Sequence, residues 1–294
     1  MGRRPAGGAE GRSATLSMAV DHFELRPTDD PLRFAWEPPP LLLTPATTLQ
    51  GGAGLGAAAT ALERVTGRPT IWATAQYLSF AAGTEPIDLE VTVEVAGHNT
   101  TQARCVLSRS GEEILTAHGA LGRRSFDDEG VWCTMPAVPA PDDSPPFKFF
   151  EHGRGHMGDL VELRLARGRQ LEEIETAGGR GDGSFALWAR AWESVRAVTV
   201  ADLAFIGDFM PLGFADAMGA PYAGNSLDNT VRVGQLVATD WVLLSVHVQQ
   251  VANGFGYGRA ELWARDGTLL GEVSQSAVLR LHSRISDAGR PPRT

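Results

Sequence analysis

The sequence predicts an α+β fold in which one unit, a long helix followed by an antiparallel sheet, occurs twice. The chain has 294 residues, about twice the length of a typical single domain. In each half, a segment with helical periodicity precedes several segments with strand-like alternation. The halves also match at an almost constant separation: Val91 precedes Val246 by 155 residues, and Arg109 precedes Arg265 by 156. Such a separation is typical of an internal duplication, with chance similarity of two β-meanders as the alternative.

The N-terminal half is predicted to hold a flexible tail over residues 1–30 and the first unit over residues 31–125. Residues 48–65 carry small and apolar residues at helical spacing, and Gly67 and Pro69 end this helix. Its many glycines and alanines indicate close packing against a neighbouring element. Strand-like segments follow at 70–80, 88–96, 101–107 and 114–121.

A proline-rich linker over residues 126–146 is predicted to separate the first unit from a second unit over residues 147–284. Residues 285–294 are expected to form a C-terminal tail. A mostly apolar segment of helical period at 199–218 opens with Thr199 as a capping residue. The strands of this unit are predicted at 161–166, 185–194, 227–233, 241–251, 258–264 and 269–281.

Composition and charge exclude several classes of protein. The formal net charge of −9 argues against binding to nucleic acid or to an anionic membrane surface. The sequence has no run of 18 apolar residues and no convincing signal peptide, so we expect neither a membrane span nor secretion. The two cysteines, Cys105 and Cys133, form no CxxC pair, which favours a reducing cytoplasm.

Four segments carry a resemblance to a known family. In the second half, an aspartate closes an apolar helical run, a Ser-(apolar)-Asp-Asn-Thr block opens a strand, and a glutamine ends an apolar strand after a turn. A weaker fourth match is a Gly-Gly pair at the head of the first helix. These segments are residues 204–209 (AFIGDF), 226–230 (SLDNT), 267–275 (GTLLGEVSQ) and 49–52 (LQGG). In order and spacing they resemble the acyl-CoA thioesterase II type over residues 40–282, which implies a double hot-dog fold.

The resemblance implies hydrolysis of acyl-CoA to a free acid and CoA, without a metal or a cofactor. Carried over by motif, Asp208, Ser226 and Gln275 would hold the attacking water. A carboxylate can accept the proton of that water, while a hydroxyl and an amide orient it. The backbone N–H groups of Gly51 and Gly52, or the turn before Ser226, are candidates for polarising the carbonyl. The implied protein is a cytoplasmic enzyme of bacterial lipid metabolism that forms a homodimer or homotetramer.

Two departures from the family pattern keep a second function open. Asn229 stands where the family usually has histidine, and Gly234 and Gln235 replace an aromatic-His-Arg run. A non-catalytic protein that binds acyl-CoA or another lipid is therefore the alternative. A hot-dog hydratase is a third hypothesis, but it needs a histidine paired with an acid, and the sequence identifies no acid opposite His247.

Two further motifs have simpler interpretations. Residues 52–57 satisfy G-x-G-x-x-A, yet no parallel strand precedes them, so close packing explains the glycines better than dinucleotide binding. His152 and His156 lie four residues apart beside Glu151, a spacing that suits a metal pair on a helix. The glycines between them favour a loop, and we expect no metal site there.

Overall fold

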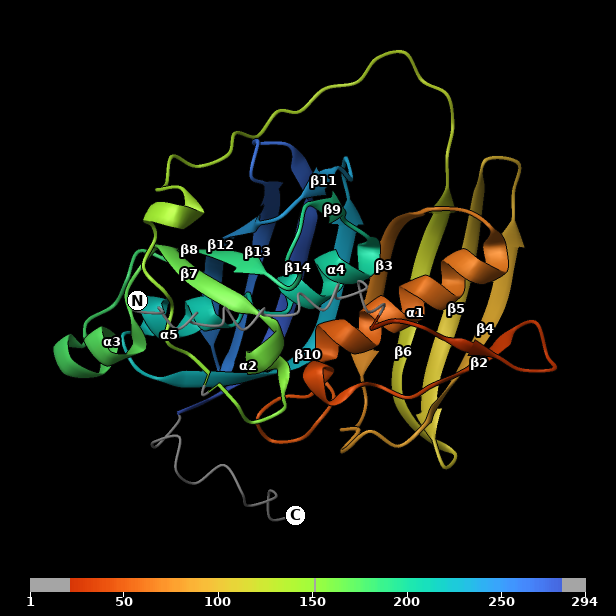
Figure 1. Cartoon of the computed structure of the whole chain (residues 1–294), viewed down its shortest axis with the longest axis horizontal. Coiled ribbons are helices and arrows are strands. Elements are labelled where there is room, and N and C mark those ends of the chain that lie inside the picture. Colours follow the sequence, from red (N-terminus) through yellow and green to blue (C-terminus); the bar gives the residue numbers. More distant parts are fainter. Residues whose placement is uncertain (1–21, 151, 282–294) are drawn as a thin grey trace, which may run out of the picture.

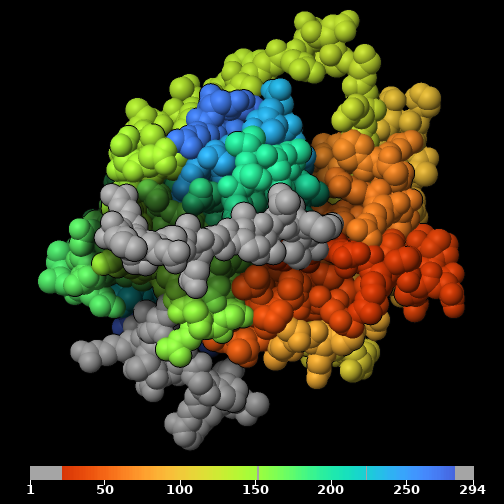
Figure 2. All heavy atoms as spheres, viewed as in Figure 1, coloured from red at the N-terminus to blue at the C-terminus, as the bar shows by residue number. Residues whose placement is uncertain are grey.

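A computed structural model describes residues 22–150 and 152–281 of the chain. Twelve strands form one antiparallel sheet with the order β1-β2-β4-β5-β6-β3-β10-β14-β13-β12-β8-β7. The sheet curls around the central helices, and the first and second units lie side by side (Figure 1). Figure 2 shows the two units in contact on this face above and below the grey atoms. The predicted double hot-dog fold is confirmed.

The first unit consists of one long helix and six strands. The helix α1 spans Gly51–Thr66; the side chain of Gln50 caps its start, and Gly67 ends it in the left-handed region, at φ 64°. A short 3-10 turn, Pro40–Leu42, precedes it. The strands are β1 (Arg26–Pro27), β2 (Arg33–Trp36), β3 (Thr70–Tyr77), β4 (Ile87–Ala96), β5 (Thr100–Arg109) and β6 (Glu112–Gly122).

The second unit has shorter helices and a matching set of strands. Its helices are α2 (Met157–Leu160), α3 (Leu171–Ala177), α4 (Val200–Gly207) and α5 (Leu212–Met218). Its strands in the large sheet are β7 (Glu162–Arg167), β8 (Ser184–Arg190), β10 (Tyr222–Val233), β12 (Val242–Ala252), β13 (Phe255–Ala264) and β14 (Leu269–Leu281). A separate pair joins β9 (Arg196–Ala197) to β11 (Ala238–Thr239).

The strand registers repeat between the two units. β3 pairs with β10 at the centre of the sheet, where Thr74 lies opposite Thr230, 156 residues later, and their hydroxyls are 2.7 Å apart. The β-bulge between Thr70 and Trp72 recurs between Ser226 and Asp228 at the same separation. Because bulges are specific local features, their repetition supports a duplication about an axis that passes between the two threonines.

The helix predicted over 199–218 is broken in two. Asp208 is the C-cap of α4, the chain then turns, and Pro211 precedes α5. A proline inside a continuous helix would lack one N–H donor and would clash with the preceding turn. The break places Asp208 at the end of a helix instead of inside one.

The glycines of α1 permit close packing against α4. A Cβ added to Gly52 would lie 2.1 Å from the carbonyl oxygen of Ala204, and one added to Gly56 would lie 3.1 Å from Ala201. Gly54 instead faces Leu115 of β6. Close packing is thus the reason for these glycines, although the partner is largely another helix. All the strand pairs in the described parts of the chain are antiparallel, which leaves the dinucleotide motif without its parallel strand.

The segments predicted as tail and linker are partly ordered. Residues 22–30 were assigned to the flexible tail, yet Phe23 and Leu25 are buried and β1 pairs with β2, because these apolar side chains complete the core. The linker arcs between the two units (Figure 1). Its end packs on the outer face of the second unit, where the indole of Trp188 donates to the carbonyl of Pro139 at 2.9 Å. The predicted C-terminal tail, 285–294, lies outside the described residues.

Within 22–150 and 152–281, no helix has both the length and the apolar character needed to cross a membrane.

Candidate active site

Asp208 lies at the junction of the two units. It follows α4, and its Oδ2 accepts a hydrogen bond of 2.9 Å from the backbone N–H of Gly52, in the first turn of α1. The positive end of the α1 dipole therefore faces this carboxylate. Only glycine fits at position 52, because a Cβ there would lie 2.7 Å from the Cβ of Asp208.

The structure brings together the three side chains that the resemblance named: Asp208, Ser226 and Gln275. The Nε2 of Gln275 donates to Oδ1 of Asp208 at 2.7 Å, and the Oγ of Ser226 donates to the same oxygen at 3.4 Å. The Nε2 of Gln275 also contacts the Oγ of Ser226. Asn229 is a fourth member that the sequence analysis treated only as a departure: its Nδ2 donates to Oδ1 of Asp208 at 3.4 Å.

A β-bulge in β10 explains how Ser226 and Asn229 reach the same carboxylate. In a regular strand, residues three positions apart point to opposite faces of the sheet. The bulge between Ser226 and Asp228 inserts one extra residue, so Ser226 and Asn229 both face the helices. Gln275 reaches the site from β14, directly opposite Asn229. Three neighbouring chain segments thus converge on Asp208.

The environment of Asp208 perturbs its acidity. Burial raises the pKa of this carboxyl from 3.8 to about 6, because the interior disfavours the charged form. The hydrogen bonds from Gly52, Gln275, Ser226 and Asn229 act in the opposite direction and keep the pKa from rising further. Asp208 is therefore ionised at neutral pH but remains a stronger base than an exposed aspartate.

Three buried polar atoms around Asp208 have no hydrogen-bond partner among the described residues. They are the Oε1 of Gln275, the Oδ1 of Asn229 and the hydroxyl of Tyr77. Unpaired buried polar atoms are rare because each costs roughly 1–3 kcal/mol. Their clustering beside one carboxylate indicates a place for a water molecule and a polar ligand group. Tyr77 comes from β3 of the first unit, and no sequence motif singled it out; only the strand register brings it here.

The two glycines proposed to polarise a carbonyl differ in the structure. The N–H of Gly52 is occupied by Asp208 and is not available to a substrate in this arrangement. Gly51 is the first residue of α1, where a backbone N–H has no acceptor within the helix. A Cβ at Gly51 would lie 3.1 Å from the hydroxyl oxygen of Tyr77, so the two groups are neighbours.

The structure gives His156 and His247 partners outside this site. The Nδ1 of His156 accepts a hydrogen bond from the backbone of Gly158 and caps α2. No cluster of three metal-ligating side chains occurs in the described residues, which do not include Glu151. The sequence identified no acid opposite His247, and this is corrected: its Nε2 lies 3.2 Å from Glu261, because adjacent strands bring them together. Both residues are on the outer face of the sheet, away from Asp208.

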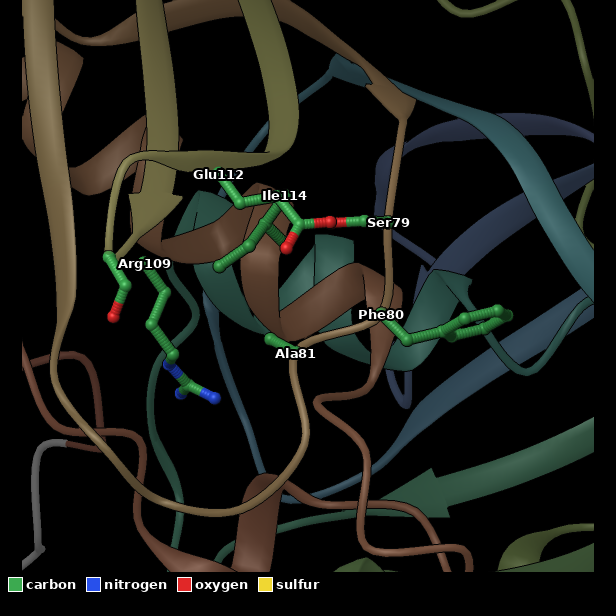
Figure 3. Close-up of a pocket in the computed structure, with 7 residues that line it drawn as sticks. Ser79, Phe80, Ala81, Arg109, Glu112 and Ile114 are labelled. Atoms are coloured by element: carbon green, nitrogen blue, oxygen red, sulfur yellow. The ribbon is translucent and has the colours of Figure 1, made fainter. Parts of the chain in front are cut away.

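A shallow pocket lies beyond the end of β3, two residues after Tyr77. Figure 3 shows its lining, in which the side chain of Arg109 extends along one side and Phe80 points away from it. The guanidinium of Arg109 donates to the backbone carbonyls of Ala82 and Glu85 and so holds the loop after β3. The pocket therefore lies close to Tyr77 in the sequence, and Asp208 is not among its lining residues.

Comparison with known proteins finds one matching family model and several similar solved structures. Residues 137–279 match the family model of the acyl-CoA thioesterase C-terminal domain. A proposed thioesterase from Novosphingobium aromaticivorans has a similar structure, with a TM-score of 0.77 and 29% identity, covering 89% of this chain and 100% of that one. An acyl-CoA thioesterase II from Mycobacterium marinum shares the fold, with a TM-score of 0.67 and 19% identity, covering 89% and 97%.

A hot-dog protein of unknown function from Alicyclobacillus acidocaldarius also shares the fold, with a TM-score of 0.75 and 19% identity, covering 89% and 97%. The search of curated proteins found no match. The second half of the chain is thus similar to the acyl-CoA thioesterase C-terminal domain, and the resemblance of the whole chain to double hot-dog thioesterases of type II is confirmed.

Proposed function

We propose that this protein hydrolyses acyl-CoA thioesters to a carboxylic acid and CoA, with water as the nucleophile. The observation that carries the proposal is the carboxylate of the half-buried Asp208, held by four donors and surrounded by unpaired polar atoms. A base of this kind, with a pKa raised to about 6, is suited to removing a proton from water near neutral pH. The thioesterase family of the second half supports the choice of substrate.

In the proposed reaction, a water molecule donates one hydrogen bond to Asp208 and a second to the free Oε1 of Gln275. As the water oxygen bonds to the thioester carbon, Asp208 takes its proton and the electron pair of the C=O bond moves onto the carbonyl oxygen. Collapse of this intermediate breaks the C–S bond and releases the CoA thiolate, which takes up the proton held by Asp208. Ser226 and Asn229 keep the carboxylate oriented throughout.

The chemistry of the cysteines favours water over a covalent route. Burial raises the pKa of the Cys105 thiol well above its ordinary value, so it stays protonated and is a poor nucleophile. Cys133 is exposed in the linker, in a different part of the chain from Asp208. A thiolate is a good leaving group, and a positioned water with one base is sufficient for this reaction class.

The test is the release of free thiol from short, long, branched and aromatic acyl-CoAs. We expect turnover of at least one class by the wild-type protein and its loss in Asp208→Asn. Asp240→Asn is the matched control, because Asp240 pairs with Arg265 near the surface, away from the site. Unchanged hydrolysis in Asp208→Asn would overturn the assignment of the base. Binding of acyl-CoA without thiol release by the wild-type protein would instead favour the non-catalytic alternative, which the departure at Asn229 motivates.

A further inference from the structure

The hydroxyl of Tyr77 is a buried donor that the mechanism above leaves unused. It has no hydrogen-bond partner among the described residues, although burying such a group without one is costly. The phenol lies against Gly51 at the head of α1 and near enough to Asp208 for that charge to act on it. Burial, followed by the charge of Asp208, raises the pKa of Tyr77 well above 10 against the opposing effect of the neighbouring Asn229 side chain, so the hydroxyl keeps its proton at neutral pH.

The other donors around Asp208 are already engaged. Gly52, Ser226 and Gln275 all donate to the carboxylate, and so does Asn229. The intermediate of thioester hydrolysis needs a donor for the negative charge that develops on the former carbonyl oxygen. The hydroxyl of Tyr77 has no hydrogen-bond partner of ordinary geometry among the described residues, and the N–H of Gly51 is adjacent to it.

The duplication gives an independent reason to connect the hydroxyl with the carboxylate. The position that corresponds to Tyr77 in the second unit, 156 residues later, is Val233, which has no polar group. The position that corresponds to Asp208 in the first unit is Gly52, which has no carboxylate. The hydroxyl and the carboxylate are therefore found together on one side of the pseudo-symmetric molecule and are both missing on the other side.

We propose that Tyr77 is a catalytic residue whose hydroxyl donates a hydrogen bond to the carbonyl oxygen of the bound thioester and to the oxyanion that forms from it. The proposal rests on the proposed acyl-CoA hydrolysis. The proton stays on the tyrosine: the electron pair of the C=O bond moves onto the oxygen, the hydrogen bond strengthens, and it weakens again when the C–S bond breaks. The first unit would thus supply the electrophilic side of the site and the second unit the base.

The variant Tyr77→Phe removes the hydroxyl and keeps the ring. We expect kcat to fall about 10²-fold, the loss typical for one oxyanion donor, because the interaction strengthens in the transition state. KM should rise by no more than about tenfold, the effect of losing one hydrogen bond to the ground-state carbonyl. Tyr257→Phe is the matched control, since Tyr257 is an exposed tyrosine on β13. The melting temperature of Tyr77→Phe should equal or exceed that of the wild type, because an unpaired buried hydroxyl is lost.

Two non-hydrolysable probes separate a contact with the carbonyl from a structural role. One is a thioether of CoA, S-alkyl-CoA, which has no carbonyl; the other is S-(2-oxoalkyl)-CoA, which carries a ketone. Tyr77→Phe should bind the thioether as the wild type does and the ketone about tenfold more weakly, the loss typical of one hydrogen bond.

Unchanged kcat, an equal loss of affinity for both probes, or a loss of activity together with a lowered melting temperature would each overturn the proposal. If the wild-type protein releases no thiol from any acyl-CoA, the proposed hydrolysis fails, and the probe pair still decides whether Tyr77 contacts a carbonyl. Failure of the wild-type protein to bind either probe would overturn both.

Discussion

Replacing Asp208 by asparagine should make the protein more stable at neutral pH while abolishing its proposed activity. The pKa of Asp208 is raised from 3.8 to about 6 in the folded protein. A shift of about two units corresponds to about 3 kcal/mol of unfolding free energy, since each unit is worth 1.36 kcal/mol. Because the folded pKa lies above the unfolded one, the protonated carboxyl stabilises the fold relative to the ionised one. This stability is fully present below pH 4 and is lost as the pH rises through about 6.

Asparagine has nearly the shape of aspartate and no charge to bury. In the wild type, Gly52 donates to one carboxylate oxygen of Asp208 and Gln275 donates to the other. In the variant, the amide nitrogen of asparagine would replace one of these oxygens, so that two donors would face each other. Gln275 can relieve this mismatch by turning its own amide, because its Oε1 has no partner. We therefore expect Asp208→Asn to be up to about 3 kcal/mol more stable than the wild type at pH 7 and about equal to it at pH 4.

Urea unfolding of Asp208→Asn and the wild type at pH 4, 5, 6 and 7 measures this difference. Groups that titrate equally in both proteins cancel when the two free energies are subtracted at each pH, so the pH dependence of the difference belongs to position 208. Asp240→Asn, the surface control, should show no comparable increase. A difference that does not change between pH 4 and pH 7, or a variant less stable than the wild type at pH 7, would refute the reasoning.

Four further outcomes follow from the same geometry. First, kcat/KM should rise with pH and level off above about pH 6, because Asp208 must be ionised to accept a proton; a flat profile from pH 4.5 to 8 would exclude it as the base. Second, Asn229→Ala should move the rise of kcat/KM to higher pH, since the hydrogen bond from Asn229 lowers the pKa of Asp208. A rise whose midpoint is unchanged or lies at lower pH contradicts this. Third, Gly52→Ala should cost about 1–3 kcal/mol in urea unfolding and most of the turnover, because its Cβ meets the backbone of Ala204. Gly54→Ala is its control, since there the Cβ meets only the tip of the Leu115 side chain, and equal effects of the two variants would contradict the steric argument. Fourth, EDTA should leave turnover unchanged, and a loss that Zn²⁺ or Mg²⁺ restores would contradict a metal-free site.

The fold was predictable from the sequence where local pattern and packing agree. The strict alternation of apolar and polar residues in β4 predicts a strand, and the small residues of α1 predict a closely packed helix. The constant separation between matching residues predicts that the same unit occurs again in the second half. The break between α4 and α5 was missed because the apolar period continues through Asp208 and past Pro211. The burial of Phe23 and Leu25 was missed because an alternation with only two apolar residues is too short to identify a buried strand.

The candidate site was predictable only in part, and for a physical reason. Asp208, Ser226 and Gln275 were named because their segments resemble those of the acyl-CoA thioesterase II type. Asn229 joins them because a bulge reverses the alternation of β10, and a bulge leaves no pattern in a single sequence. Tyr77 joins them through the pairing of β3 with β10, which connects residues of different units. Contacts that depend on strand register between distant segments were thus the ones that sequence reasoning could not supply.

The duplicated architecture itself explains why position 208 carries a carboxylate and the equivalent position 52 does not. Gly52 and Asp208 occupy equivalent positions, 156 residues apart, and they are in direct contact across the pseudo-twofold axis. An aspartate at both positions would force two Cβ atoms to within 2.7 Å and bring two buried negative charges together. A symmetric pair of identical chains must place the same residue at both positions. A single chain with two divergent units can place a carboxylate at one and a glycine N–H at the other, and the hydrogen bond that orients Asp208 requires both.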